Sequence, residues 1–309
     1  MSELSVSAPR IDEIPALRAI WKTVFGEVGE KAFFSHLFNA ELCAVAKVGD
    51  APAAMGFLVE AGDIVTCWTP ELKATQKSNA AQTYKQGITD APKAAHLPCA
   101  MIYAVATLSK HRGLGLGTAV VNELIIKARE RGYPAVVLCP SDDSLFKYYS
   151  ERTDLRDWFF VHEQIFENAP AMSRPAPIKR ISADEYCTLR ECLLHGKMHV
   201  RQNISLLEYQ EKLCDELGGG LFQIGDSCAV VEQQPNGEIW IKELLVCGND
   251  EANKVVSAVA GEFAATKYIV RTPANAKCGR RFGMIALRND ISIDINENTQ
   301  PPWYGLAFD

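Results

Sequence analysis

The chain has 309 residues, a formal net charge of −6 and ten cysteines. This length exceeds one compact core of common size and predicts two domains. The acidic balance, without a lysine or arginine tract, argues against nucleic acid as a main partner. Apolar stretches are short and interrupted by charge, and the first residues, MSELSVSAPRIDE, lack the order of a signal peptide, so we expect no membrane segment and a cytoplasmic protein. No Cys-x-x-Cys pair occurs, which favours reduced thiols over disulfides or metal.

The first hundred residues predict two helices, a hairpin and a long polar connection. Apolar residues recur at helical spacing in 11–25, and a second helix is expected at 31–39. Two apolar runs, 42–48 and 52–60, flank Gly49-Asp50 and predict a β-hairpin. The polar segment 67–97 is longer than a usual connection. It is either a substrate lid, with Trp68, Tyr84 and His96 facing an acceptor, or a solvated insertion.

Residues 101–131 carry the strongest chemical signal of the chain. Met101–Leu108 has the composition of a buried strand, and an amphipathic helix follows from Thr118 to the residues before Gly132. The loop between them, KHRGLGLG, has three glycines at alternate positions and two cations, Lys110 and Arg112. Bare backbone before a helix N-terminus forms an anion site, so we expect a phosphate or pyrophosphate there.

The spacing of these glycines excludes two common phosphate motifs. No lysine follows the last glycine, as a P-loop requires, and Gly115 and Gly117 are separated by one residue, not the two of a dinucleotide fingerprint. The pattern Arg112-x-x-Gly115-x-Gly117 after a Val-Ala-Thr strand resembles the coenzyme A loop of the GNAT N-acetyltransferase superfamily. The alternative is a tight strand-to-helix turn that binds nothing. The resemblance implies acetyl-CoA as cofactor and the following contacts: Val105, Ala106, Thr107, Arg112, Gly113, Leu114, Gly115, Leu116, Gly117 and Thr118.

A second part of the resemblance concerns a tyrosine. After a short strand at 135–139, Ser141-Asp142-Asp143 caps a helix that runs through Tyr148 and Tyr149. In GNAT enzymes a tyrosine near the end of this helix protonates the leaving thiolate, and Tyr149-Ser150-Glu151-Arg152 matches the start of that pattern. The Gly-Phe end of the pattern is absent, so Tyr148 is an alternative candidate for the proton donor. In a further alternative, both rings only pack the helix onto the sheet. A strand at 158–166 is expected to end this domain.

The proline-rich segment 168–177 predicts a linker between a catalytic domain, 1–167, and a second domain, 178–309. The second half repeats the order of helices, hairpin, longer strand, helix and strand. We therefore expect an α/β fold of two tandem GNAT-like domains, each a mixed sheet flanked by helices. Asp250 and Glu251 stand where the first loop has cations, so the second domain is expected to be degenerate, not to bind coenzyme A, and to close the acceptor cleft or hold a homodimer.

These features predict an acetyl-CoA-dependent N-acetyltransferase in which the primary amine of a small molecule or peptide attacks the thioester directly, with Tyr149 as general acid. The alternative is a non-catalytic acyl-CoA sensor or scaffold. Aminoacyl transfer from tRNA is disfavoured by the acidic balance. Candidate bases are Glu60, Asp63 and Asp309. Cys192, His195 and His199 have the spacing of one helical face, but Gly196 interrupts it and no fourth ligand is evident, so no metal is expected.

Overall fold

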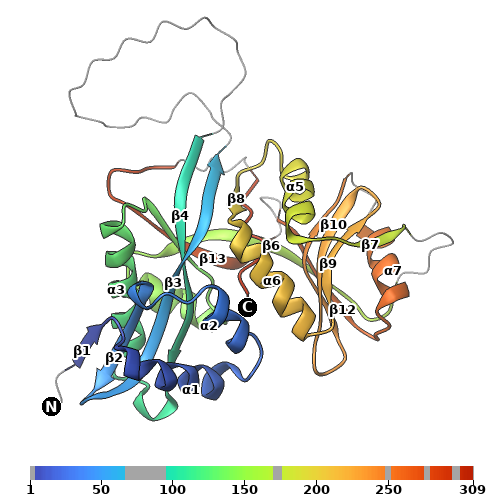
Figure 1. Ribbon diagram of the computed structural model, residues 1–309. Coiled ribbons are helices and arrows are strands. Elements are labelled where there is room, and N and C mark those ends of the chain that lie inside the picture. The colour runs from blue at the N-terminus through green and yellow to red at the C-terminus, as the bar shows by residue number, and fades with distance from the viewer. Residues whose placement is uncertain are drawn as a thin grey trace, which may run out of the picture.

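The computed structural model describes residues 4–66, 95–169, 176–247, 252–274, 279–293 and 300–308. Within these ranges the strands form one mixed sheet of 13 strands, with helices on both faces (Figure 1). The elements of the first half are β1 (Leu4–Ser7), α1 (Ile14–Phe25), α2 (Glu30–His36), β2 (Cys43–Val48), β3 (Ala51–Thr66), β4 (Ala95–Thr107), α3 (Leu116–Glu130), β5 (Ala135–Leu138), α4 (Asp143–Ser150) and β6 (Arg156–Phe166).

The second half repeats much of this order. Its elements are β7 (Ile178–Arg180), α5 (Ala183–Leu193), β8 (His199–Gln202), α6 (Ile204–Glu216), β9 (Gly220–Ile224), β10 (Ser227–Gln233), β11 (Ile239–Leu245), α7 (Ala252–Glu262), β12 (Tyr268–Pro273) and β13 (Arg280–Leu287). The predicted fold class, a mixed sheet flanked by helices, is confirmed. The sequence analysis found every helix longer than one turn but missed the short strands β1, β7 and β8 and the longer β13.

Local signals explain where several helices begin. Ser182 and Glu185 form a capping box at α5, in which each side chain bonds the backbone of the other. Asp142 caps α4 by accepting a hydrogen bond of 2.8 Å from the backbone N–H of Ser144. The expected helical face of Cys192, His195 and His199 is wrong, because α5 ends at Leu193 and His199 lies in β8, bonded to Glu191 and the Lys197 carbonyl.

The strand order joins the two halves into one sheet. It runs β1-β2-β3-β4-β5-β13-β6-β12-β11-β10-β9-β7. Strand β13, near the end of the chain, therefore lies between β5 and β6 of the first half and is antiparallel to both. The strand expected at 158–166 is present as β6, and on its other side it pairs with β12 of the second half. The linker boundary at 168–177 stays a prediction, but the halves do not have separate sheets (Figure 1).

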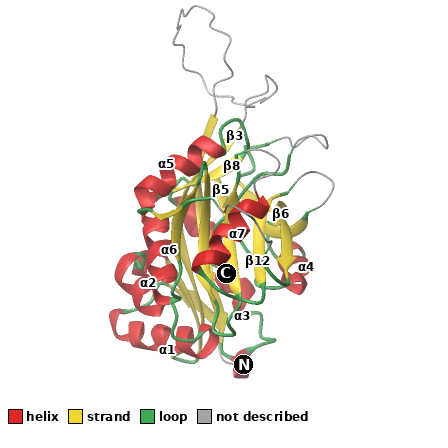
Figure 2. Ribbon diagram, turned by 90° about the vertical axis from the view of Figure 1, so that its right-hand side faces the viewer, coloured by secondary structure: helices red, strands yellow, loops and turns green. Residues whose placement is uncertain are grey.

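Two layers of helices bury the two faces of the sheet. Helices α1, α2, α5 and α6 lie along one face, where Leu17, Phe33, Tyr186 and Leu207 share one apolar cluster (Figure 2). Helices α3 and α4 cover the other face of the first half, and α7 covers that of the second half. Helix α6 packs beside α2, so the two halves are in direct contact on this face of the sheet.

Candidate active site

A β-bulge interrupts β4 in the middle of the sheet. Phe57 of β3 pairs with Tyr103, whereas Met55 pairs with Ala106, so two residues of β4, Ala104 and Val105, oppose one residue of β3. Ala104 has φ 49°, a left-handed conformation that alanine rarely adopts. A bulge turns backbone N–H groups away from the ladder, so this strand can offer donors to a bound molecule.

Strand β4 separates from its parallel neighbour at the same point. The β4–β5 register pairs Cys99–Ile102 with Ala135–Leu138 and ends there, although β4 continues to Thr107. The opening between the two strands is the mouth of a cavity of about 660 Å³. Its walls include the bulge residues Ala104 and Val105 and the residues that follow β5, among them Cys139.

The glycine loop and α3 lie just beyond the bulge. Gly113 and Gly115 have φ values of 83° and 76°, and a Cβ placed on either would meet nothing within 4 Å. Gly115 is the N-cap of α3 and no side chain caps the helix, so the first N–H groups of the helix are available to an anion. Lys110, Arg112 and Leu114 are exposed beside them. Among the predicted contacts, Leu116 and Ala106 have buried side chains and can contribute backbone atoms only.

The structure separates the two tyrosines of α4. Tyr149 lines the cavity, next to Leu145 and Ser141. Tyr148 instead bonds Thr118 at the start of α3, with 2.6 Å between the hydroxyl oxygens, and the Arg152 guanidinium covers its ring. Burial raises the pKa of Tyr149 to about 12, and Tyr148 and Asp142 add to the effect. A phenol with this pKa keeps its proton at neutral pH.

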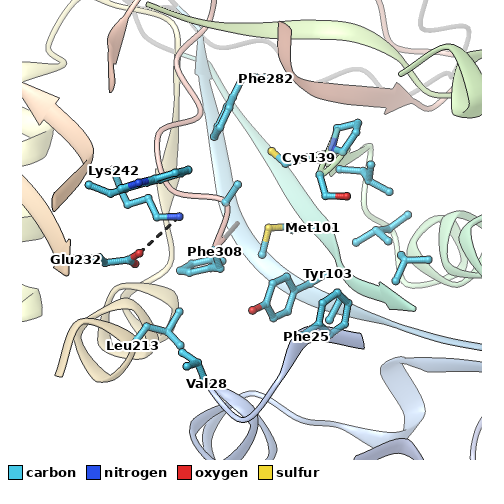
Figure 3. Close-up of a pocket in the computed structure, with 18 of the residues that line it drawn as sticks. Phe25, Val28, Met101, Tyr103, Cys139, Leu213, Glu232, Lys242, Phe282 and Phe308 are labelled. Carbon is cyan, nitrogen blue, oxygen red and sulfur yellow. Dashed lines mark ion pairs between the residues drawn. The ribbon is translucent and has the colours of Figure 1, made fainter. Parts of the chain in front are cut away.

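The opposite wall of the cavity comes from the second half. Tyr209 and Leu213 of α6, Trp240 and Lys242 of β11 and the near-terminal Phe308 all line it. Figure 3 shows Phe308 between Met101 and Tyr103 on one side and Lys242 and Glu232 on the other. Lys242 and Glu232 are buried and form an ion pair at 3.6 Å. The sequence did not identify any of these residues as site residues, because they belong to the half that lacks a recognisable motif.

Helix α1 completes the cavity with Trp21, Phe25 and, after the helix, Val28. Trp21 is buried in an aromatic cluster with Phe33 and Tyr103. The helical spacing of Leu17, Ile20 and Trp21 identified the buried face of α1 in the sequence. The same spacing did not indicate that Trp21 also lines a cavity.

The other predicted residues lie elsewhere. Glu60 and Asp63, two candidate bases, line a separate pocket of about 460 Å³ with Tyr133 and Arg201. His96 lies beside Asp63, with 3.6 Å between Nδ1 and Oδ2. Outside the described residues lie Trp68, Tyr84, Asp250, Glu251 and Asp309.

In the described part of the chain, no group of three or more His, Cys, Asp or Glu side chains could hold a metal ion. None of the helices there is long and apolar enough to span a bilayer.

The bulged strand that parts from its parallel neighbour, the glycine loop and the uncapped helix all lie within one segment of the first half. Residues 14–150 match the model of the Acetyltransferase (GNAT) family. The chain therefore contains an acetyltransferase domain of the GNAT family, as its sequence predicted. A search of curated proteins found no match to the sequence.

Solved structures extend the similarity beyond this domain. GCN5-related N-acetyltransferases from Kribbella flavida and Anabaena variabilis each superpose with a TM-score of 0.60 at 14% identity, covering 92% of this chain and 72% of theirs. Eis1 from Mycobacterium abscessus superposes with a TM-score of 0.56 at 11% identity, covering 92% of this chain and 73% of its own. At these identities the similarity establishes the fold, and it includes the second half of the chain.

Proposed function

We propose that the protein is an N-acetyltransferase that moves the acetyl group of acetyl-CoA to a primary amine of a small molecule or peptide. The observation that carries the proposal is the bulge at Ala104 and Val105, which faces the cavity where β4 parts from β5 and lies opposite Tyr149. The GNAT domain supports acyl transfer in general. The acetyl donor, the amine acceptor and the role of the tyrosine belong to the proposal.

The residues of the loop fit the donor. The space at Gly113 and Gly115 leaves their backbone open, and the uncapped N-terminus of α3 supplies N–H groups for a diphosphate. Lys110 and Arg112 add positive charge. The free edge of β4 from Val105 to Thr107 can pair with an extended pantetheine arm through main-chain hydrogen bonds.

The same arrangement suits direct transfer. Acetyl-CoA supplies an acetyl group activated as a thioester. A neutral amine that enters from the side of the second half attacks the acetyl carbon, so a C–N bond forms as the C–S bond breaks. Backbone N–H groups at Val105 and Ala106 would stabilise the oxygen as it gains charge. Tyr149 would give its proton to the departing sulfur, for which a buried phenol with a pKa of about 12 is suited.

The test is acetyl-CoA binding by calorimetry together with release of free thiol across a panel of primary amines. We expect saturable binding and amine-dependent thiol release, with the acetylated amine detected by mass spectrometry. Binding without turnover of any amine would favour the alternative, a non-catalytic acyl-CoA sensor or scaffold. Absence of binding would overturn both.

A further inference from the structure

The acceptor side of the cavity has an apolar and aromatic mouth built from both halves of the chain. The first half contributes Phe25 and Val28, which are 43% and 42% exposed. Leu213 of α6 and Leu217, the residue after the helix, line the cavity from the second half. Exposed apolar side chains that continue into a cavity are unfavourable in water and mark a surface that a ligand covers.

The mouth is held in a fixed shape. The backbone N–H of Gly29 donates a hydrogen bond of 2.8 Å to the Glu216 carboxylate at the end of α6. A Cβ at Gly29 would lie 2.6 Å from Leu213 Cδ2 and 3.0 Å from the Tyr209 hydroxyl oxygen, so the α1–α2 connection and α6 are in close contact. Trp21 Nε1 donates to the Val28 carbonyl at 3.4 Å. The two apolar walls therefore belong to one preformed site.

Further in, the lining is aromatic. The Phe308 ring centroid lies 5.8 Å from that of Tyr103 and 5.3 Å from that of Tyr209. The hydroxyl oxygens of Tyr103 and Tyr209 lie 3.0 Å apart, so the two hydroxyl groups point toward each other and the rings remain as contact surface. Flat rings of this kind pack against an apolar or aromatic ligand body.

Negative charge is scarce in this region. Among the described residues that line the cavity, Glu232 is the one carboxylate, and it is bonded to Lys242 at 3.6 Å and to the Gln210 amide at 2.8 Å. Three cations also line the cavity, Lys242, Arg271 and Arg280, and the two arginines pair with Glu163 behind them. A second ammonium group on the acceptor would be desolvated without a matching acid among the described lining residues.

We infer that the acceptor is a monoamine whose amine is carried on an apolar or aromatic body, which binds between α1 and α6. This inference rests on the proposed function and names its acceptor class. The apolar body would be buried by Phe25, Val28 and Leu213 and would stack on the rings around Phe308, which leaves the amine directed toward the bulge of β4. A polyamine or a hydroxyl-rich amine would lose hydration without regaining hydrogen bonds.

Three amines of similar length test the inference. Hexylamine, 2-(2-aminoethoxy)ethanol and 1,6-diaminohexane differ in the polarity and charge of the body. We expect kcat/KM for hexylamine to exceed that for each of the others by about tenfold or more, as burial of a few additional apolar groups predicts. Equal or faster turnover of the ether alcohol or the diamine would overturn the inference and leave the proposed function intact.

A pair of variants locates the effect. Val28→Gln should reduce the preference for hexylamine over the ether alcohol several-fold. Ile126→Gln is the control, since Ile126 is 48% exposed on α3 and does not line the cavity. Both variants should melt close to the parent, because both side chains are exposed. An unchanged preference in Val28→Gln would also overturn the inference.

Binding separates this inference from the proposed function. Calorimetry on the protein saturated with coenzyme A measures amine binding without chemistry. Preferential binding of hexylamine with no acetylation of any amine would support the inference about the pocket and refute the enzymatic function. Acetylation of the three amines without any preference for hexylamine would support the proposed enzymatic function and refute the inference about the pocket.

Discussion

The two halves of the molecule carry the same bulge but use it differently. In the first half, Ala104 and Val105 of β4 oppose a single residue of β3. In the second half, Val230 of β10 pairs with Glu243 and Val231 with Ile241, so Lys242 is the additional residue of β11. Both bulged strands run parallel to their next neighbour for a few residues and then continue without it, paired only with the preceding strand. The duplication expected from element order is therefore also present in the strand register.

What surrounds each bulge differs. Next to Ala104 there is a cavity and a loop with open glycines. Lys242 lines the same cavity but is buried in an ion pair with Glu232, and the following Glu243 is fully buried. Glu243 accepts hydrogen bonds from Tyr186, Arg190 and Trp303. The bulge of the first half thus borders an open cavity and a glycine loop. The bulge of the second half is fixed by ion pairs and hydrogen bonds.

The largest expected effect is on the proposed acid of the first half. Tyr149→Phe should lower kcat by about 10²–10⁴-fold while acetyl-CoA affinity is retained, because only the proton donor is removed. Since the pKa of Tyr149 is raised to about 12, the phenol stays protonated and the parent should show no falling limb of kcat between about pH 6 and pH 10. Steady-state kinetics across this range measure both.

Tyr148→Phe is the matched control for this variant. It removes the bond to Thr118, so we expect a loss of about 1 kcal/mol in unfolding free energy and a kcat within a few-fold of the parent. If Tyr148→Phe abolished turnover and Tyr149→Phe did not, the two tyrosines would have to exchange roles.

A substitution at the second bulge should lower the free energy of unfolding. Glu243→Gln removes the fully buried one of the two carboxylates that pair with the buried Arg190 guanidinium and leaves only the partly exposed Glu191, so we expect a loss of about 3 kcal/mol in the free energy of unfolding by urea. Burial alone would lower the pKa of Arg190, and the Glu243 carboxylate raises it instead, so this arginine remains charged at all accessible pH values. The exposed pair of Arg288 and Asp290 offers a control, in which Asp290→Asn should cost less than about 1 kcal/mol.

The same variant tests whether the second bulge contributes to acetyl-CoA binding. Glu243→Gln should bind acetyl-CoA as tightly as the parent at temperatures where it is folded. A loss of donor affinity without a loss of stability would show that the second bulge is part of the donor site, and the comparison between the halves would fail.

The smallest of these effects is expected in the glycine loop. Gly115→Val places a β-branched side chain at φ 76° and at the open edge of the anion site, so acetyl-CoA affinity should fall by about tenfold or more. Gly132→Val is the control at the other end of α3, where φ is 85° and the space is equally open. Both should be destabilised to a similar extent, but only Gly115→Val should weaken binding in calorimetry.

The sequence alone determined features that depend on neighbouring residues. The glycines and cations of 110–117 specify a loop before a helix whatever the chain does elsewhere, and Asp142 and Ser182 specify helix starts through their own side chains. The apolar runs 42–48 and 52–60 likewise predicted β2 and much of β3. For this reason the fold class and the proposed donor loop could be predicted.

Only the tertiary structure decided how these parts meet. Strand β13 has an ordinary strand sequence, and nothing in it specifies pairing with β5, about 150 residues earlier. The choice between Tyr149 and Tyr148 depends on how α4 packs, since adjacent helical residues point in different directions. The cavity walls at Val28, Leu213 and Phe308 come from three distant segments. Such contacts form through packing across the whole chain, and no local pattern encodes them.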